Sequence, residues 1–370
     1  MKPAVRRKLG RLRLASQLVE TSGPPPHRAV DVVRQLTAMQ AQDFPGAKWA
    51  VGLRLPGATD SDIEDSLADG SNVRSWPLRG TLHFVAAEDL GWMLSLSADR
   101  MIKRSATIFA NEGLTAKVLA RAGESARGAL AGGRSLSRDE LYRLLQDSGV
   151  STVGQARYHA VWYLCQTGAL CLGPPNGKTQ TFVLLDEWVP DPRRLERDDA
   201  LGELAGRYFR SHGPATVRDF SWWSALTLTE ARKGLTIARR QLAALEVDGL
   251  EYFLSPDLPG VSPDLPGEPS ASGTRLLPGF DEYLLGYGDR RVALADEHSP
   301  LVFPGKNGMF LPTIVVDGAV VGTWRRTATS RQVAVTAQAF EPLPARIRAA
   351  VDLAAAEYAR FVGLTLSPDA

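Results

Sequence analysis

Apolar residues near the start of the chain recur at intervals that predict helices and then a small hairpin. Over residues 11–20 and 28–38 they are three or four positions apart, which places them on one face of a helix. The order Ser-Asp-Ile-Glu at residues 61–64 is a capping box and predicts a short helix that ends near Gly70. Residues 73–85 alternate imperfectly between apolar and polar side chains, which predicts strand, turn and strand. Helices followed by a hairpin are typical of a winged helix.

The same order of elements recurs in the middle of the chain as a loose architectural repeat. Helix, turn, helix and wing is the order found in DNA-binding winged helices. The predicted elements of this second unit are a capping box at 137–140, a helix with its apolar face over 141–145, a helix through 158–164, and strands at 169–172 and 181–184 around the hairpin dipeptide Asn176-Gly177.

A third helical unit follows and ends in a short extended segment. Its helices are predicted at 201–210, 217–224 and 229–238, with a capping box at 227–230 and the extended segment at 250–254. We therefore predict three tandem winged-helix units, at residues 1–133, 134–198 and 199–257.

The pattern changes from helices to strands near the C-terminus. Residues 258–273 are rich in Pro, Gly and Ser and are expected to be a linker. A meander is predicted over 303–324, with turns at Asn307-Gly308 and Asp317-Gly318, followed by a strand at 333–335 and a helix over 343–362 that ends at Gly363. We expect residues 274–370 to form a small β-barrel module with a terminal helix. The predicted fold class is α+β, mainly helical.

Composition limits the class of protein but does not identify a partner. The 370 residues are 44% hydrophobic and 23% charged, as in a globular protein of several modules, and the formal net charge is only +2. Any nucleic-acid site must therefore come from local patches. The first thirteen residues hold six basic and no acidic side chains, which suits either a phosphate-binding arm or a solvated terminus.

Export, a membrane anchor, a disulfide framework and a metal site are all disfavoured by the sequence. No apolar stretch follows the basic start or approaches the length of a membrane span, so we expect a cytoplasmic protein. Cys165 and Cys171 lie in an apolar run, which argues against a disulfide or a thiol-ligated metal. No ligand spacing is found among His27, His159, His212 and His298. We therefore predict no metal and no other cofactor.

Two glutamines at the end of the second predicted helix are the first candidates for chemistry. Gln40 and Gln42 are two positions apart, so on extended backbone their amides face the same side. A neutral amide offers one acceptor and two donors, so the pair can hold a water, a phosphate oxygen and a base edge. Taken alone, Gln-Ala-Gln is more often a polar helix terminus, and the interpretation depends on the rest of the chain.

Four blocks of sequence together resemble the AlkZ-like bacterial DNA glycosylases. They occur in order across most of the chain: Gln-Ala-Gln at 40–42, Arg-Gly-Thr-Leu-His at 79–83, Leu-Pro-Gly-Phe-Asp-Glu-Tyr-Leu-Leu-Gly-Tyr at 277–287, and a segment from Asn-Gly to Thr-Trp-Arg-Arg at 307–326. The resemblance implies three tandem winged helices and a β-barrel around a concave DNA-binding face. It also implies a catalytic Gln-apolar-Gln motif and hydrolysis of the N-glycosidic bond of N7-alkylated purines, including interstrand crosslinks left by antibiotic-type alkylators. Some relatives carry Asp at the second motif position, and Gln42 resembles the crosslink-resistance branch.

The chemistry supports the same motif on independent grounds. An N7-alkylated purine is cationic and leaves as a neutral base, so the reaction needs little acid catalysis. What remains is to stabilise an oxocarbenium-like sugar and to aim a water at C1′, which uncharged amides can do. We assign Gln40 and Gln42 to this task. Asp43 could supply negative charge to the sugar, although capping or turn formation before Pro45 is its more ordinary role.

Four basic side chains are candidates for contact with DNA, each with a structural alternative. Arg79 and His83, on the first predicted wing, could bind phosphate, or form a surface salt bridge and a structural hydrogen bond respectively. Arg325 and Arg326 could bind backbone phosphates or be solvated charges at a strand end. Asp281 and Glu282 are adjacent, so on a strand they would face opposite ways and could not act as paired carboxylates.

Three functions are consistent with these observations. The first is a monomeric, monofunctional DNA glycosylase that acts on duplex DNA with bulky, crosslinked or simpler N7-alkylpurines, in DNA repair or in self-resistance to a DNA-alkylating natural product. The second is a non-catalytic winged-helix DNA-binding protein, such as a regulator. The third is a damage-recognition factor that does not cleave. The glutamine pair favours the first. All three would bind DNA in a salt-dependent manner, so only base release separates them.

Overall fold

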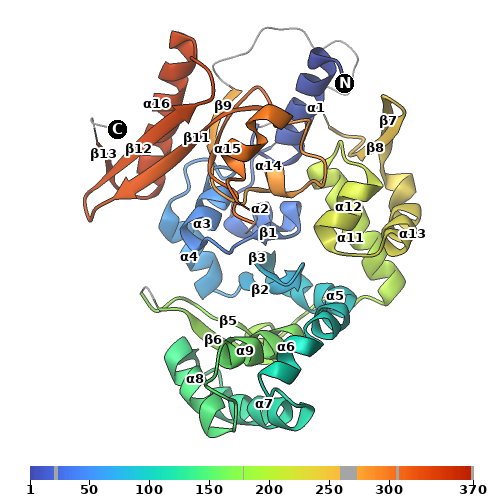
Figure 1. Cartoon of the computed structure of the whole chain (residues 1–370), viewed down its shortest axis with the longest axis vertical. Helices are drawn as coiled ribbons and strands as arrows, with labels where there is room; N and C mark the ends of the chain where they lie inside the picture. Colours follow the sequence, from blue (N-terminus) through green and yellow to red (C-terminus); the bar gives the residue numbers. More distant parts are fainter. Residues whose placement is uncertain (21–23, 178, 259–272, 306–307, 368–370) are drawn as a thin grey trace.

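The protein has a mixed α and β architecture in which helices form about half of the chain (Figure 1). The structure is a computed structural model, and it describes residues 1–20, 24–177, 179–258, 273–305 and 308–367. In Figure 1 a lower lobe, formed by the described residues between 106 and 184, lies beneath a larger upper body. The turn residue Asn307 lies outside the described residues, as does the predicted linker at 258–273 except for its two end residues.

The N-terminal part builds the upper body around the first hairpin. Its elements are α1 (Pro3–Ser16), α2 (Ala29–Leu36), β1 (Met39–Gln40), α3 (Phe44–Gly52), α4 (Asp60–Ala68), β2 (Asn72–Leu78) and β3 (Thr81–Ala86). The hairpin predicted over 73–85 is confirmed as β2 and β3. The cap of α4 differs from the prediction, because Thr59 and Asp62 form the capping box two residues before the expected pair at 61 and 64. Helix α3 was not predicted, and it includes Pro45, which is well tolerated in the first helical turn.

The lower lobe and its connections follow in the sequence. Their elements are α5 (Leu90–Arg104), α6 (Ala106–Asn111), α7 (Ala116–Leu130), β4 (Leu136–Ser137), α8 (Arg138–Asp147), α9 (Ala156–Gln166), β5 (Leu170–Leu172), β6 (Thr181–Leu184) and α10 (Leu185–Trp188). The capping box of Ser137 and Glu140, the second helix and the hairpin are confirmed. Helices α5, α6 and α7 fill a stretch for which the sequence analysis made no prediction.

The helices predicted for the third unit are confirmed, and each is close to its expected bounds. They are α11 (Arg197–His212), α12 (Val217–Ser224) and α13 (Leu228–Ala238), with Thr227 and Glu230 as the capping box of the last. The extended segment is β8 (Leu250–Leu254), which pairs with an additional strand, β7 (Ala243–Val247). The division of the chain into three winged-helix units remains a prediction.

The C-terminal part is an open sheet rather than a closed barrel. Its elements are β9 (Thr274–Leu277), α14 (Glu282–Leu285), α15 (Ser299–Val302), β10 (Thr313–Val316), β11 (Ala319–Ala328), β12 (Gln332–Ala339), α16 (Ala345–Phe361) and β13 (Thr365–Leu366). The sheet order is β13-β12-β11-β10-β9, so among the described residues its two edges do not pair and it forms a curled half-barrel. The turn at Asp317-Gly318 is confirmed, with both residues at positive φ. The meander expected from residue 303 begins only at β10, because the described residues between α15 and β10 form neither helix nor strand.

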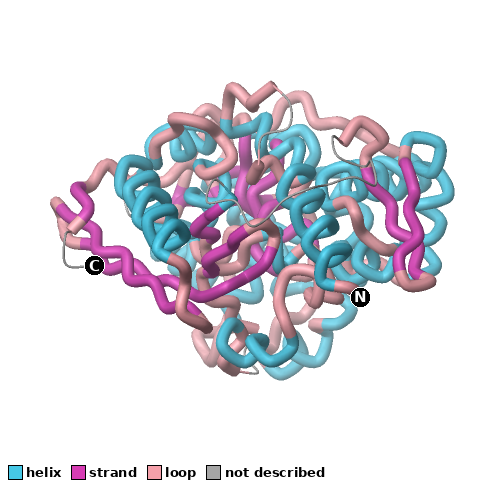
Figure 2. The backbone as a smooth tube through the Cα atoms, turned by 90° about the horizontal axis from the view of Figure 1, so that it is seen from above, coloured by secondary structure: helices cyan, strands magenta, loops and turns pink. Residues whose placement is uncertain are grey.

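One sheet joins the upper body to the lower lobe. Its order is β1-β3-β2-β5-β6-β4, and the link between the lobes is the pair Arg74↔Leu172 of β2 and β5. Figure 1 shows these strands descending from the centre of the upper body into the lobe, and Figure 2 shows the helices packed around the central strands. The first two predicted winged units therefore share a sheet.

The half-barrel packs against the helix that follows the glutamine motif. Trp49 of α3 donates its indole N–H to the carbonyl of Leu276 at 2.8 Å, and Trp324 of β11 donates to Leu277 at 2.7 Å. Both indoles are buried, together with Tyr358 of α16, whose ring lies 5.3 Å from that of Trp49. A buried donor costs free energy unless it is paired, so the bond from Trp49 fixes β9 against α3 and the bond from Trp324 fixes β9 against β11.

Candidate active site

The Gln-Ala-Gln motif lies where β1 ends, and its backbone is held from several sides. Gln40 pairs with His83 across the β1–β3 ladder. The N–H of Ala41 donates to the carbonyl of Leu82 at 2.7 Å. Arg74 of β2 donates from Nε and Nη2 to the carbonyl of Ala41, at 3.0 and 2.6 Å. The motif therefore leaves the strand in a fixed direction.

The two motif amides present N–H donors rather than oxygens to the outside. Oε1 of Gln40 accepts from Arg79 Nη2 at 3.2 Å and from Thr81 Oγ1 at 3.5 Å. Oε1 of Gln42 accepts from the backbone N–H of Leu82 at 3.4 Å. Arginine and backbone N–H groups can only donate, so these contacts fix the orientation of both amides. Among the described residues neither amide nitrogen has an acceptor.

Exposure distinguishes the two glutamines. Gln40 is 9% exposed and lies in the floor of the site, whereas the side chain of Gln42 is exposed. A carbonyl oxygen has two lone pairs, and both are used at Gln40 but only one at Gln42. Gln42 can therefore both donate to and accept from a water, while Gln40 can only donate.

Arg79 points inward from the β2–β3 turn and orients Gln40. Its φ of 52° and the φ of 69° at Gly80 are both positive, which is the conformation of a tight hairpin turn. Besides Gln40, its guanidinium donates to the carbonyl of Trp223 and to Nε2 of His83, the latter at 3.1 Å. Burial lowers the pKa of Arg79, and the nearby carboxylate of Glu282 opposes this shift. Its predicted contact with phosphate is untested, whereas these hydrogen bonds show it as a positioning group.

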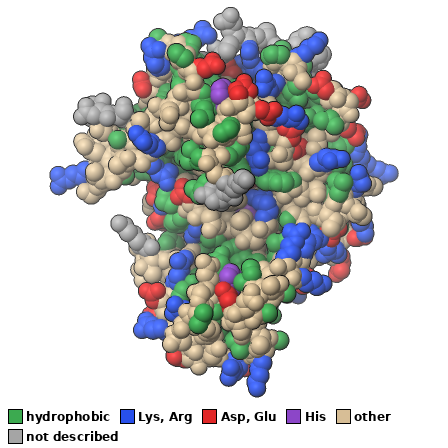
Figure 3. All heavy atoms as spheres, in the orientation of Figure 1, with side chains coloured by type: hydrophobic (Ala, Val, Ile, Leu, Met, Phe, Trp, Pro, Cys, Tyr) green, Lys and Arg blue, Asp and Glu red, His purple; other side chains and the backbone are tan. Residues whose placement is uncertain are grey.

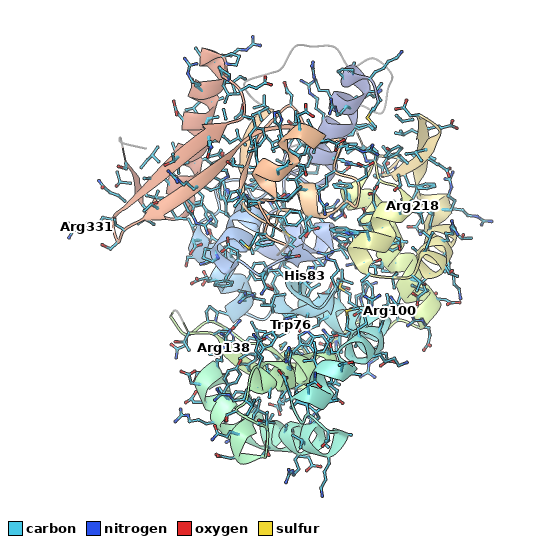
Figure 4. All side chains as sticks on the ribbon, viewed as in Figure 1. Trp76, His83, Arg100, Arg138, Arg218 and Arg331 are labelled. Carbon is cyan, nitrogen blue, oxygen red and sulfur yellow. The ribbon has the colours of Figure 1, made fainter. Side chains whose placement is uncertain are left out.

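His83 is neutral and fully buried at the centre of the molecule (Figure 4). Its Nδ1 lies 2.7 Å from the carbonyl of Thr81, which can only accept, so Nδ1 carries the proton. Its Nε2 faces Arg79, which can only donate, so Nε2 is the acceptor. Burial, and then the charge of Arg79, lower the pKa of His83 to about 3. With 0% of its surface exposed, the ring supports Arg79 from below and does not reach the molecular surface.

Glu282 lies beneath the motif, and no role was predicted for it from the sequence. Its carboxylate is 1% exposed and accepts from the backbone N–H of Gln40 at 3.1 Å and from the indole N–H of Trp223 at 2.8 Å. Nε2 of His212 lies 3.3 Å from the same carboxylate. Burial raises the pKa of Glu282. The hydrogen bond from His212 and the charge of Arg79 lower this pKa by more than burial raises it, so the net value is about 2. A negative charge is therefore held directly behind Gln40.

Asp281 and Glu282 do point apart, but not because they lie on a strand. Asp281 caps the short helix α14 and accepts from the N–H of Tyr283 at 2.9 Å. Its carboxylate also forms a bidentate pair with Arg54, at 2.8 and 2.9 Å, that is almost fully buried. This pair ties the start of α14 to the segment that directly follows α3. The helical conformation corrects the strand expected from the sequence, and neither carboxylate can act with the other in hydrolysis.

The C-terminal arginines lie beside the other end of the motif. Arg326 of β11 contacts the carboxylate of Asp43 at 3.4 Å, while Arg325, which points to the opposite face of the strand, is exposed. Asp43 is the N-cap residue of α3 but makes no side-chain capping bond. Its carboxylate fills the space at Gly46, where a Cβ would come within 2.3 Å. The DNA-binding roles of Arg325 and Arg326 remain predictions.

The surface is indented between the upper body and the lower lobe, on the left side of Figure 3. Figure 4 shows His83 above this junction and Trp76 below His83. Arg138 lies on the upper side of the lower lobe. Arg138 lies near enough to Arg74 for its charge to lower the pKa of Arg74, after the larger effect of burial, to about 10. The motif is therefore close to the junction of the two lobes.

Three expectations from the sequence concern metal ions, membrane spans and the two cysteines. Among the described residues, no cluster of three or more His, Cys, Asp or Glu side chains could hold a metal ion. Over the same residues, no helix is long and apolar enough to cross a membrane. Cys165 and Cys171 are both buried and free.

Acid is expected to destabilise the protein through His83. The pKa is 6.5 in an unfolded chain and about 3 here, so below pH 6.5 the unfolded state binds more protons and the free energy of unfolding falls as pH falls. Between pH 6.5 and pH 5 this amounts to about 2 kcal/mol. We expect His83→Gln to reduce the difference in unfolding free energy between pH 7 and pH 5 by that amount. Urea unfolding at the two pH values measures it, with the exposed His27→Gln as control. An unchanged difference in His83→Gln would contradict the neutral, buried state.

The candidate site thus consists of two oriented amides and a buried carboxylate that holds the backbone of Gln40, close to the junction of the two lobes. The sequence profile described as DNA glycosylase AlkZ-like matches residues 33–361, so the chain belongs to the AlkZ-like DNA glycosylase family. A curated relative from Streptomyces sahachiroi, named interstrand DNA cross-link repair glycosylase, is 32% identical over 369 residues, covering 96% of each chain. The solved structure of the Streptomyces sahachiroi DNA glycosylase AlkZ superposes with a TM-score of 0.78 and 30% identity, covering 98% of each chain.

Proposed function

We propose that this chain is a monofunctional DNA glycosylase that hydrolyses the N-glycosidic bond of N7-alkylated purines. The observation that carries the proposal is the orientation of Gln40 and Gln42, whose amide nitrogens have no acceptor among the described residues and are free for a substrate. The relative named for interstrand cross-link repair supports an extension to bulky or crosslinked lesions. Such an activity serves DNA repair or self-resistance to a DNA-alkylating natural product.

In the proposed reaction the leaving base needs no acid. N7-alkylation makes the purine cationic, so the electrons of the C1′–N9 bond neutralise it as that bond breaks. A water forms the new bond to C1′ of the oxocarbenium-like sugar and gives its proton to solvent. Gln42, exposed and able both to donate and to accept, holds this water. Gln40 donates to an oxygen of the adjacent phosphate or sugar and so fixes the distance to C1′.

The buried carboxylate supplies the electrostatic part of the proposal. Glu282 is ionised at neutral pH and is joined to Gln40 through a backbone hydrogen bond. Its charge is partly neutralised by Arg79, which has no direct hydrogen bond to it. A fixed negative charge behind the amides stabilises the positive sugar as it develops, without any reorganisation of the site.

An open site suits a lesion that cannot leave the duplex. Many glycosylases rotate the damaged nucleotide out of the helix, but a base tied to the opposite strand cannot rotate freely. The side chain of Gln42 is exposed rather than enclosed in a deep pocket. This arrangement supports action on adducts that crosslink the two strands as well as on adducts attached to one strand of the duplex.

The proposal is tested by base release from a duplex with one N7-methylguanine. The purified protein is incubated without metal or cofactor, and abasic sites are cleaved with alkali and separated on a gel. We expect a cleaved strand that increases with time and exceeds spontaneous depurination in a control without protein. If neither this duplex nor an N7-crosslinked duplex gives product while both are bound, the chain is a non-catalytic DNA-binding protein.

A further inference from the structure

A cleft of about 1020 Å³ is lined by Trp222, which contacts Arg79 of the candidate active site. It is bordered by α12, the β7–β8 hairpin, α1 and the segment that follows α14. Trp222 of α12 lines it and is 38% exposed, an unusual exposure for so large an apolar side chain. The guanidinium of Arg79, which orients Gln40, lies 5.5 Å from the centre of the Trp222 ring. The cleft is therefore only two contacts away from a catalytic amide.

Arg290 is held rigidly in the same wall. Its guanidinium carbon lies 4.8 Å from the ring centre of Trp222, 5.4 Å from Phe303 and 5.0 Å from Phe310. Nε donates to the carbonyl of Leu284 at 2.9 Å. Its two terminal nitrogens find no acceptor among the described residues, although the side chain lines the cleft. Aromatic contacts thus fix a guanidinium whose outer donors are free.

The charges around the cleft fit a neutral ligand better than a phosphate backbone. The lining side chains include five arginines and five acids, so the cleft has no net positive charge apart from the chain terminus. That terminal amine is itself paired with Asp248 at 3.2 Å, and Asp289 is paired with Arg291 at 2.6 Å. Sites for backbone phosphates require an excess of basic groups. Clefts of about 300 to 1,000 Å³ with aromatic walls and a few fixed polar groups take drug-sized molecules.

We infer that this cleft receives the substituent carried on N7 of the damaged purine and selects a planar aromatic group with a hydrogen-bond acceptor. This inference rests on the proposed function. N7 lies on the base edge exposed in the major groove, so its substituent projects away from the base while C1′ stays at the motif. The aromatic plane packs against Trp222 and Phe303, and its acceptor binds the free donors of Arg290. Adduct recognition is thereby separate from the residues that cut the bond.

Filling the cleft tests the inference without disturbing the motif. Gly288 lines the cleft, is exposed, and does not have a positive φ. A Cβ there would lie 3.5 Å from Trp222, which is ordinary van der Waals contact. We expect Gly288→Leu to lower the single-turnover excision of N7-(quinolinylmethyl)guanine from a duplex by about tenfold or more, because the aromatic ring loses its place. Excision of N7-methylguanine should stay within about twofold of wild type, because a methyl group does not enter the cleft.

A second variant and a matched control complete the test. Arg290→Met removes the donors but keeps an apolar side chain, and it should show the same selective loss. Gly128→Leu, at an exposed position of α7 with open space around it, should excise both adducts like wild type. Equal losses on both adducts in Gly288→Leu and Arg290→Met, or no loss on either, would overturn the inference. Failure of the wild-type protein to release N7-methylguanine is a different result, because it contradicts the proposed glycosylase itself.

Discussion

Replacement of Gln42 by alanine is expected to lower the single-turnover rate of N7-methylguanine excision by about 100-fold, with little change in affinity for undamaged duplex. The side chain is exposed, so its loss removes the group that holds the water without opening a cavity. Gln40→Ala should lower the rate by a similar factor, because Gln40 sets the position of the sugar or phosphate. The rates are measured by alkaline cleavage and the affinities by titration of an unmodified duplex.

The matched control is Gln35→Ala, an exposed glutamine of α2 five residues before the motif. It should behave like wild type in both assays. If Gln40→Ala and Gln42→Ala weaken binding of undamaged DNA as much as they slow excision, the pair serves to bind the backbone and the catalytic assignment is wrong.

Glu282→Gln is expected to lower excision by about 30-fold or more while the duplex is still bound. The change removes the negative charge behind Gln40 and places an amide against three groups that all donate to the carboxylate: the N–H groups of Gln40 and Trp223 and the ring of His212. Because an uncompensated buried network costs about 3 to 5 kcal/mol, the thermal unfolding temperature should fall as well. Glu357→Gln, on the exposed face of α16, is the control for loss of a carboxylate.

A double-mutant cycle separates a role through Gln40 from a general loss of folding. If Glu282 acts by placing and polarising Gln40, the double variant with Gln40→Ala should excise no more slowly than Gln40→Ala alone. The excision rates must be compared below the unfolding temperature of each variant. Fully additive losses would show that the charge of Glu282 acts on the sugar directly rather than through the amide of Gln40.

Local signals in the sequence predicted most helices and hairpins because each depends on neighbouring residues. The capping boxes of Ser137 and Thr227 and the turn at Asp317-Gly318 are formed within a few positions, and all three are present. The open half-barrel was not predicted, because strand order and closure depend on pairings between distant segments. Helix α3 was missed because a proline in a first turn and a proline that breaks a helix look alike in a single sequence.

The candidate site was likewise predicted where local spacing identifies residues, and not where it depends on contacts between distant segments. Gln40 and Gln42 were found from their spacing, and the block at 277–287 drew attention to Glu282 without giving it a role. That Glu282 lies under Gln40 follows from contacts across 242 positions of the chain, which no local pattern encodes. The inward orientation of Arg79 likewise depends on Trp223, a residue 144 positions away. The signal that could have indicated these roles is the presence of a charged residue within an otherwise apolar block, since a buried charge requires partners.

The sheet that runs through both lobes has a consequence for how such enzymes can be rebuilt. Strand β2 carries Arg74, which holds the carbonyl of Ala41, and the same residue is paired with Leu172 of the lower lobe. The lower lobe therefore cannot be exchanged as an independent module. Its removal would leave β2 with an unpaired edge, and a different lobe in its place would have to restore the pairing register between β2 and β5. Changes of substrate range are more readily made in the loops around the cleft than by exchanging whole modules.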